Sequence, residues 1–328
     1  MRFKFQNIFL LVVPLVILLL TSSSSYSSEL PITSKQLVYI MPDSKIPFWH
    51  IMGRGIQSTA DSLGYDIDIY DAQNSARLEI QFIAKAIKDK VSGIIVSPSN
   101  SSACVTILKL AERAEIPVVI ADIGTESGKY ISYISSNNKD GAYFIGKLLS
   151  KKLLELGWEN GRVGIIAIPQ KRQNGQARTA GFMQAIDEHG IKSASIKQLV
   201  TWSTEETYDF TREMLNKHPD LRAIWLQTSN IYKGALRAIV DSGKQDEVLL
   251  ITFDAEPEFL ELIPQGSIVG SAMQQPYLMG MESVKAMDKH LNEKPVEKNL
   301  QLPILIISSE NITDKLPVIN KMVLGIEN

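Results

Sequence analysis

The chain has 328 residues, of which 45% are hydrophobic and 21% are charged, and its formal net charge is −2. This length and composition predict a globular protein with room for two lobes of ordinary domain size, and they exclude a disordered, collagen-like or disulfide-stapled chain. The near-neutral charge leaves no basic footprint for nucleic acid or for an anionic membrane surface. The single cysteine, Cys104, excludes an intramolecular disulfide and is predicted to pack on a helix face.

The first residues differ from the rest of the sequence. Arg2 and Lys4 precede an unbroken apolar run over residues 8–20, and a small polar tract follows over residues 21–28. This order is typical of a cleavable signal peptide, which we expect to end at residue 27. The apolar run would form a helix of roughly 20 Å against a hydrocarbon core of ~30 Å, so a permanent membrane anchor is the weaker alternative. The sequence therefore predicts export to the periplasm, with a net charge of −4 once Arg2 and Lys4 are removed.

In the first half of the chain, short β-rich runs alternate with helical patterns, which is typical of βαβ units around a parallel sheet. The predicted strands are 37–41, 66–70, 93–96 and 118–121. The predicted helices begin near Pro47 and cover 76–88 and 102–114. We expect these four strands to complete one open sheet, so the predicted fold class is α/β.

The same alternation restarts after residues 130–138. The predicted helices are 142–156, 176–189, one that follows Trp202, 232–241 and a short one that ends at 263. The predicted strands are 162–168, 196–200, 223–226 and 248–253, and a further short run covers 270–273. Ser203 and Glu206 have the spacing of a capping box at the start of the helix after Trp202.

Two segments of the sequence resemble each other. GIIVSPSN is followed by a strand that ends at Asp122, and AIWLQTSN is followed by a strand that ends at Asp254. The similarity favours a weak internal duplication, in which two lobes share one topology. Chance similarity between βαβ units is the alternative.

Candidate binding residues lie where the predicted strands end. In open parallel sheets, ligands bind beyond the carboxyl ends of the strands, where helix N-termini also lie. The side chains at such ends are Phe48, Trp49, Asn100, Asp122, Trp202, Thr228, Asp254 and Gln274. Aromatic rings stack on the C–H faces of a sugar, and carboxylate, amide and hydroxyl groups pair with its hydroxyls. The set predicts a site for a small polar ligand, with a sugar as the best fit, although core packing and helix capping are the structural alternatives for the individual residues.

The sequence lacks the motifs of common enzymes and cofactor sites. No GxGxxG follows a strand, and no P-loop, GxSxG, HExxH or CxxC occurs. The four histidines lack ligand spacing, and Asp66, Asp68 and Asp71 fit the solvated edge of a strand better than a calcium loop. The prediction is a binding protein, not an enzyme, with no catalytic residue, cofactor or metal.

Several ordered motifs over residues 37–308 together resemble the type I periplasmic binding proteins, and within them the ribose-binding group. These motifs are PFW at 47–49, LGYDIDIYDAQN ending at Asn74, GIIVSPSN, IPVVIAD, ARTAGF at 177–182, KGALRAI at 233–239, LITFDAEPE and AMQQP at 272–276. The resemblance implies two Rossmann-like lobes with parallel sheets, joined by a three-crossing hinge and closing on the ligand. We expect an N-terminal lobe of 36–136 plus 275–305 and a C-terminal lobe of 137–274 plus 306–328.

The resemblance also implies roles for individual residues. It implies ring contacts from Phe48, Trp49 and Trp202, and polar contacts from Asn100, Asp122, Arg178, Thr228, Asp254 and Gln274. Arg178 is the one member that the strand ends do not select. Ile46 and Ile123 stand where the ribose binders have a hydrogen-bonding Asn and Arg, and Thr228 stands where they have an Asn. We therefore expect less polar reach and a ligand other than ribose, such as a deoxy or substituted sugar, another small polyol or a signal molecule.

The function that the resemblance implies is that of a monomeric periplasmic receptor, which delivers a sugar to the membrane permease of an ABC importer. The alternative is a periplasmic sensor that reports ligand occupancy to a membrane histidine kinase or chemoreceptor. The sequence does not separate the two. An exported hydrolase would need a nucleophile motif, and a sugar-responsive repressor would carry a DNA-binding helix in place of the export segment.

Overall fold

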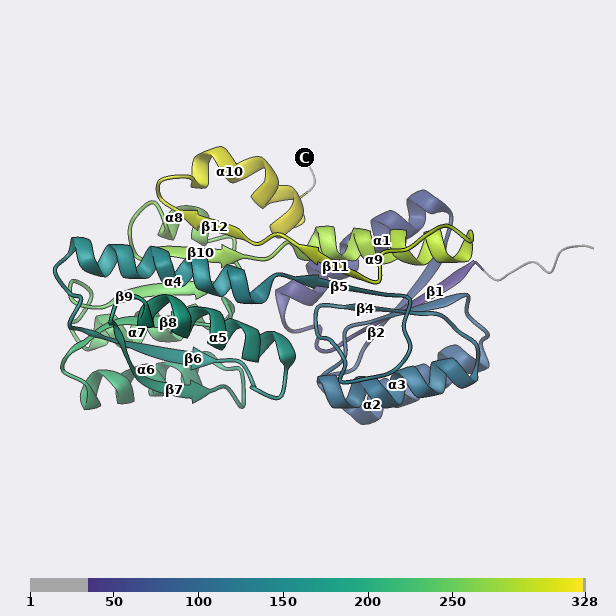
Figure 1. Ribbon diagram of the computed structural model, residues 1–328, viewed down its shortest axis with the longest axis horizontal. Helices are drawn as coiled ribbons and strands as arrows, with labels where there is room; N and C mark the ends of the chain where they lie inside the picture. The colour runs from purple at the N-terminus through teal and green to yellow at the C-terminus, as the bar shows by residue number, and fades with distance from the viewer. Residues whose placement is uncertain (1–34, 327–328) are drawn as a thin grey trace, which may run out of the picture. The chain divides into compact units, whose positions relative to one another are not determined.

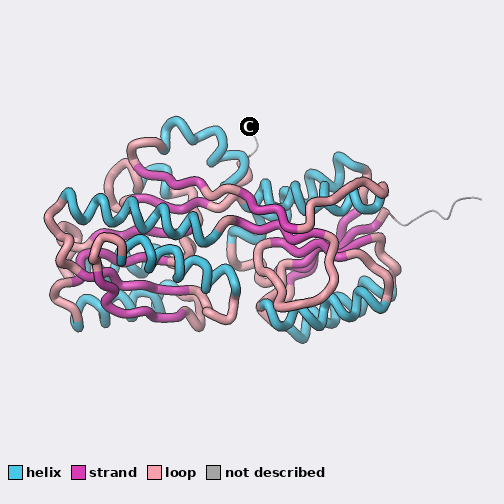
Figure 2. Tube along the Cα trace, in the orientation of Figure 1, coloured by secondary structure: helices cyan, strands magenta, loops and turns pink. Residues whose placement is uncertain are grey.

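The computed structural model describes residues 35–326, and the predicted signal peptide lies outside them. The described chain forms two six-stranded sheets with helices packed on both faces of each (Figures 1 and 2). The predictions of an α/β fold and of two lobes are confirmed. Within residues 35–326, we find no helix with the length and apolar character needed to cross a bilayer.

The first lobe contains the sheet with the order β11-β5-β4-β3-β1-β2, in which all neighbouring strands are parallel. Its strands are β1 (Gln36–Met41), β2 (Asp66–Asp71), β3 (Gly93–Val96), β4 (Val118–Ala121), β5 (Ser132–Ser136) and β11 (Asn299–Leu302). Its helices are α1 (Pro47–Leu63), α2 (Ala76–Lys88), α3 (Ser101–Arg113) and α9 (Pro276–Leu291). The expectation that four strands complete this sheet is wrong, because β5 and β11 extend it beyond β4.

The second lobe contains the sheet with the order β12-β10-β9-β8-β6-β7. Its strands are β6 (Arg162–Ala167), β7 (Lys192–Gln198), β8 (Leu221–Leu226), β9 (Leu249–Phe253), β10 (Gly270–Met273) and β12 (Leu305–Ser308). Its helices are α4 (Asn138–Glu155), α5 (Gln173–Asp187), α6 (Thr204–Lys217), α7 (Tyr232–Asp241), α8 (Phe259–Leu262) and α10 (Ile312–Val318), which continues into a π-helical turn, η1 (Ile319–Val323). Only β12 is antiparallel to its neighbour in this sheet.

The two sheets follow the same connection rule. In each, the first strand of the lobe lies between the second and the third, and the later strands add on in sequence order. This correspondence confirms the predicted repetition of one topology. The chain passes between the lobes after β5, after β10 and between β11 and β12, which makes the three predicted crossings (Figure 1).

Close backbone contact joins the two helices that cover one face of the first sheet. A Cβ added at Gly55 of α1 would lie 2.2 Å from the carbonyl oxygen of Tyr277, and one added at Gly280 of α9 would lie 2.3 Å from that of Met52. Side chains at these positions would force the helices apart. Gly55 and Gly280 are therefore packing residues.

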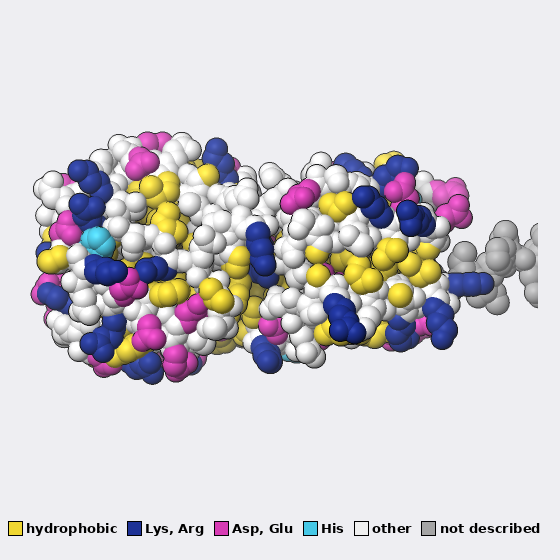
Figure 3. Space-filling model, turned by 90° about the horizontal axis from the view of Figure 1, so that it is seen from below, with side chains coloured by type: hydrophobic (Ala, Val, Ile, Leu, Met, Phe, Trp, Pro, Cys, Tyr) yellow, Lys and Arg dark blue, Asp and Glu magenta, His cyan; other side chains and the backbone are white. Residues whose placement is uncertain are grey.

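Charged side chains on the face shown in Figure 3 are scattered over both lobes, with both signs interspersed. This distribution agrees with the near-neutral composition. Cys104 is fully buried in α3, which confirms its predicted packing role, and burial raises the pKa of its thiol to about 12.

Candidate ligand-binding cavity between the lobes

A cavity lies between the two lobes, at the carboxyl ends of the central strands. Its walls come from the start of α1 and the end of β4 in the first lobe, and from the ends of β6, β8 and β9 in the second. The empty space between these walls, including its opening to solvent, is about 620 Å³.

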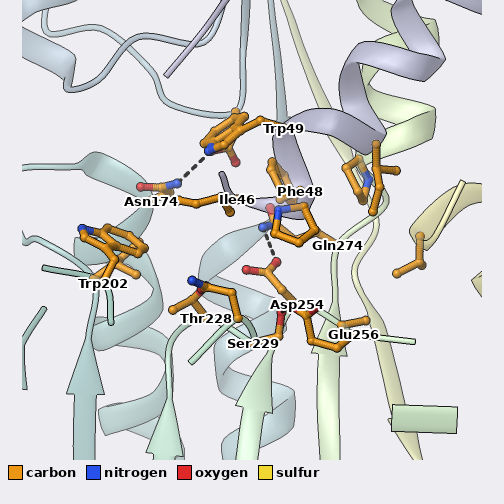
Figure 4. Close-up of a pocket in the computed structure, with 18 of the residues that line it drawn as sticks. Ile46, Phe48, Trp49, Asn174, Trp202, Thr228, Ser229, Asp254, Glu256 and Gln274 are labelled. Carbon is orange, nitrogen blue, oxygen red and sulfur yellow. Dashed lines mark hydrogen bonds between the residues drawn. The ribbon is translucent and has the colours of Figure 1, made fainter. Parts of the chain in front are cut away.

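Eight of the nine predicted binding residues line this cavity, and Figure 4 labels all of them except Asp122 and Arg178. They are Phe48, Trp49, Asp122, Arg178, Trp202, Thr228, Asp254 and Gln274. The structure does not bring the ninth, Asn100, to the cavity wall. Its Oδ1 atom accepts from the backbone N–H of Ala103 at 2.9 Å and from the hydroxyl of Ser102 at 2.7 Å, so Asn100 caps helix α3. Capping is the structural alternative that its position at a strand end left open.

Asp122 and Asp254 occupy equivalent positions in the two lobes. Each directly follows a strand end and has a left-handed backbone, with φ of 63° and 68°. The backbone N–H of Asp122 donates to Ile134 and that of Asp254 to Ala272, both at 2.9 Å. Such backbone conformations cost about 1–3 kcal/mol in residues other than glycine, and they persist where surrounding bonds hold them. The two lobes therefore present one carboxylate each to the same cavity.

Arg178 lies beside Asp254 and is held from several sides. Its Nε atom donates to Oδ1 of Asn138 at 2.8 Å, and its Nη1 atom donates to the carbonyl of Gln227 at 2.6 Å. The same Nη1 lies 3.6 Å from Oδ2 of Asp254, and the guanidinium stacks 3.8 Å from the ring centroid of Phe253. A guanidinium fixed in this way loses little conformational freedom when a ligand arrives.

Burial perturbs the acids of the cavity. It raises the pKa of Asp122 to about 6, although Arg178 partly offsets this effect, and it raises the pKa of Glu256 to about 7. Burial also raises the pKa of Asp254, against the opposing effect of Arg178. Each charged carboxylate is therefore costly at these buried positions, and hydrogen-bond donors on a ligand would lower that cost.

Two buried acceptors in the cavity have no hydrogen-bond partner among the described residues. They are Oδ1 of Asp122 and Oε1 of Gln274. The other oxygen of Asp122 accepts from Asn174 at 3.2 Å, and the amide nitrogen of Gln274 donates to Asp254 at 2.6 Å (Figure 4). Because buried polar atoms are nearly always hydrogen-bonded, these two oxygens are suited to ligand hydroxyl groups.

Aromatic rings form further parts of the wall. Phe48 and Trp49 pack edge to face with their ring centroids 4.8 Å apart. Trp202 has a left-handed φ of 58°, and its backbone N–H donates to the carboxylate of Glu206 at 3.0 Å. The predicted capping box is half confirmed, since Ser203 accepts from the N–H of Glu206, whereas the Glu206 carboxylate binds the loop of Trp202 instead of the N–H of Ser203.

The cavity also contains residues that the sequence prediction missed. These are the polar residues Arg172, Asn174, Ser229, Asn230 and Glu256, and the apolar residue Val323. The polar ones follow strands β6, β8 and β9, so the strand-end rule could have selected them. Val323 lies in η1, beyond the last strand, and no pattern in the sequence marks it.

The cavity agrees only in part with the expectation that fewer hydrogen-bonding side chains line the site. Ile46 lines the wall, and the Thr228 hydroxyl donates to Asn230 at 2.8 Å. Ile123, however, is fully buried in the core of the first lobe and does not line the cavity. Arg172 supplies a second guanidinium from the second lobe, which also carries Arg178. Among residues 35–326, no group of three or more His, Cys, Asp or Glu side chains is placed to hold a metal ion.

A two-lobed α/β protein with a polar and aromatic cavity between its lobes has the architecture of a solute-binding protein. A sequence model described as the periplasmic binding protein domain matches residues 37–295. The chain therefore belongs to the periplasmic binding protein family, and the predicted resemblance to its type I members is confirmed. Because this is a family of solute-binding proteins, the result also agrees with the prediction of binding instead of catalysis.

Curated relatives cover most of the chain. The ribose import binding protein of Haemophilus influenzae is 29% identical over 266 residues, which cover 80% of this chain and 87% of that protein. The D-apiose import binding protein of Actinobacillus succinogenes is 27% identical over 278 residues, which cover 83% of this chain and 88% of that protein.

Solved structures share the fold. A periplasmic solute-binding protein from Actinobacillus succinogenes with bound D-allose has a TM-score of 0.78 at 22% identity, and the match covers 85% of this chain and 99% of that one. A carbohydrate transporter solute-binding protein from Agrobacterium radiobacter in complex with D-arabinose has a TM-score of 0.80 at 21% identity, with 88% and 98% covered.

Proposed function

We propose that this protein is an exported periplasmic receptor that captures a sugar or polyol of monosaccharide size between its lobes and delivers it to the permease of an ABC importer. The observation that carries the proposal is the pairing of Asp122 and Asp254. They come from different lobes, occupy equivalent left-handed positions and line one cavity beside Arg178. Vicinal hydroxyl groups are the ligand chemistry that such carboxylates and guanidinium groups accept.

Binding would be coupled to lobe closure, because a ligand that contacts both aspartates holds the two lobes together. Domain closure around a ligand is a common form of conformational change in two-lobed proteins. The closed pair then offers one combined surface to a membrane partner. The names of the ribose and D-apiose import binding proteins support the importer role. The cleavable signal peptide, the monomeric state and the expected lobe boundaries are part of this proposal.

The ligand that we propose is a sugar other than ribose. Ile46 places an apolar side chain on the cavity wall, and Phe48 and Trp49, two and three residues later in the sequence, also line it. A ligand with a deoxy position or an apolar substituent would lose less hydration there than a fully hydroxylated pentose would. Arg172 and Glu256 add polar groups elsewhere on the wall, so the ligand must still carry several hydroxyls.

A thermal-shift screen of the protein without residues 1–27 tests the proposal. The panel comprises D-ribose, D-allose, D-apiose, D-arabinose, D-fucose and myo-inositol. A ligand present at 100 times its Kd stabilises the folded state by about 2.7 kcal/mol, which raises the Tm by several degrees. We expect at least one sugar other than ribose to do so.

Variants connect the thermal shift to the cavity. Asp122→Ala and Asp254→Ala should abolish the shift, whereas Asp220→Ala, which removes an exposed aspartate, should retain it. No shift with any member of the panel would contradict sugar binding. A larger shift with D-ribose than with every other member would contradict only the choice of ligand.

A further inference from the structure

Arg172 connects the second lobe to the first. It is the residue before α5, and its side chain is almost fully buried. Its Nε atom donates to the carbonyl of Ser99 at 3.1 Å, and its Nη2 atom donates to Oδ1 of Asn74 at 3.3 Å. Ser99 and Asn74 belong to the first lobe, so both hydrogen bonds cross from one lobe to the other.

A buried acid fixes the segment that accepts from Arg172. Oε1 of Glu79 in α2 accepts from the N–H of Ser99 at 2.5 Å, and Oε2 accepts from the Ser99 hydroxyl at 3.2 Å. Glu79 is fully buried, and its burial raises the pKa of the carboxyl to about 6, an effect that nearby Arg172 opposes. The Ser99 carbonyl that accepts from Arg172 therefore lies in a segment that the buried Glu79 carboxylate holds in place.

The next two residues of the second lobe also contact the first lobe. The side-chain amide of Gln173 donates to the carbonyl of Thr125 at 3.2 Å, and that of Asn174 donates to Oδ2 of Asp122 at 3.2 Å. Three consecutive residues thus make four hydrogen bonds across the lobes. All four join protein to protein, so they do not depend on a ligand.

Arg172 also contacts the ring of a cavity residue. Its guanidinium carbon lies 5.1 Å from the ring centroid of Trp202, a distance at which a cation is attracted to the face of an indole. Arg172 and Trp202 both line the ligand cavity, and both also line an adjoining cavity that contains Asn74 and Asn100. The two side chains therefore stand between the ligand cavity and this second cavity.

We propose that Arg172, Gln173 and Asn174 form an interlobe latch, which holds the cavity closed and slows the escape of a bound ligand. Within the latch, Arg172 is a positioning residue for Trp202. The latch raises the fraction of molecules that are closed, and apparent affinity increases with that fraction. Since the latch is broken only when the lobes open, its loss should act mainly on the dissociation rate.

Distance measurements between spin labels test the latch without a ligand. Cysteines introduced at Lys88 in α2 and Asn216 in α6 are exposed and lie on different lobes, whereas native Cys104 is buried and stays unlabelled. We expect a closed, short-distance population in the unmutated protein and a smaller one in Arg172→Met. Arg162→Met, which removes a half-exposed arginine of the same lobe, is the matched control and should leave the distances unchanged. Equal distributions in Arg172→Met and the unmutated protein, or an unmutated protein that is open throughout, would overturn the proposal.

Dissociation kinetics test the second part of the latch, and this experiment rests on the proposed function. The probe is the panel sugar that raises the Tm most, and its release is followed by the fluorescence of Trp49 and Trp202. Loss of two hydrogen bonds from a charged donor predicts release that is roughly 100-fold faster or more from Arg172→Met, with little change in the association rate. Arg172→Lys should recover part of the effect, because it keeps the charge but not the fork of donors. Unchanged release would refute the latch, whereas absence of any sugar binding would refute the proposed function and leave the distance experiment to decide on the latch.

Discussion

Replacing Asp122 with asparagine should stabilise the ligand-free protein while it impairs binding. Asp122 is only 3% exposed, and burial raises the pKa of its carboxyl from an ordinary value of 3.8 to about 6. Each pKa unit corresponds to about 1.4 kcal/mol, so the charged carboxylate costs the folded state roughly 3 kcal/mol at pH 7.5. Because the pKa of Asp122 is raised in the folded state, folding favours its protonated carboxyl. The stabilisation from this protonated form is fully present below about pH 4 and is lost as the pH rises through about 6.

Urea unfolding of the unmutated protein and of Asp122→Asn at two pH values measures this effect. We expect the variant to be more stable by roughly 3 kcal/mol at pH 7.5 and by roughly 1 kcal/mol at pH 4.5, where most of the penalty has disappeared. Asp220→Asn is the control, because the exposed ion pair with Arg162 at 2.9 Å lowers the pKa of Asp220 and predicts a change of opposite sign. A variant that is less stable than the unmutated protein, or whose stability gain does not depend on pH, would refute the reasoning.

Three further substitutions test the packing and the boundary of the site. Gly55→Ala should lower the Tm by several degrees, because its Cβ would lie 2.2 Å from a backbone oxygen of α9. Gly53→Ala is the control and should be tolerated, since the nearest atoms to its Cβ lie at 3.7 Å, and equal melting temperatures of the two variants would contradict this packing. Asn100→Ala should cost about 1 kcal/mol of stability, because it removes the helix cap, and should leave the sugar affinity measured by calorimetry unchanged. A large loss of affinity would show that Asn100 contributes to the binding site after all. Phe182→Ala should cost about 3–5 kcal/mol in urea unfolding, because Phe182 stacks on Trp225 at 3.8 Å inside the second lobe, and a cost below about 1 kcal/mol would contradict that packing.

Much of the fold could be predicted from the alternation of apolar runs and helical patterns. Helices α2 and α7 and the buried strands β3 and β4 have the predicted bounds. The pattern failed for β5, whose sequence SYISS is mostly small and polar although four of its five residues are buried. It failed again for β11 and β12, which are short strands beside a lobe crossing and are defined by the neighbours they pair with. These three strands depend on tertiary contacts more than on their own residues.

The residues of the candidate site that follow directly after predicted strands could be predicted from the sequence. Asp122, Thr228 and Asp254 lie just beyond the ends of parallel strands, and the structure brings all three to one cavity. The same rule selected Asn100, but it cannot tell an exposed strand-end residue from a helix cap. Val323 could not be predicted for another reason. It lies in η1 near the C-terminus, and only the folding of the chain brings it to the cavity wall.

The most direct test of the central claim is a crystal structure of the protein with the panel sugar that binds most tightly. We predict a sugar between the lobes, with its hydroxyls on Asp122, Asp254 and Arg178 and one face against an aromatic ring of the wall. Electron density for the sugar outside the cavity, or a bound sugar that contacts neither aspartate, would contradict this account of the site.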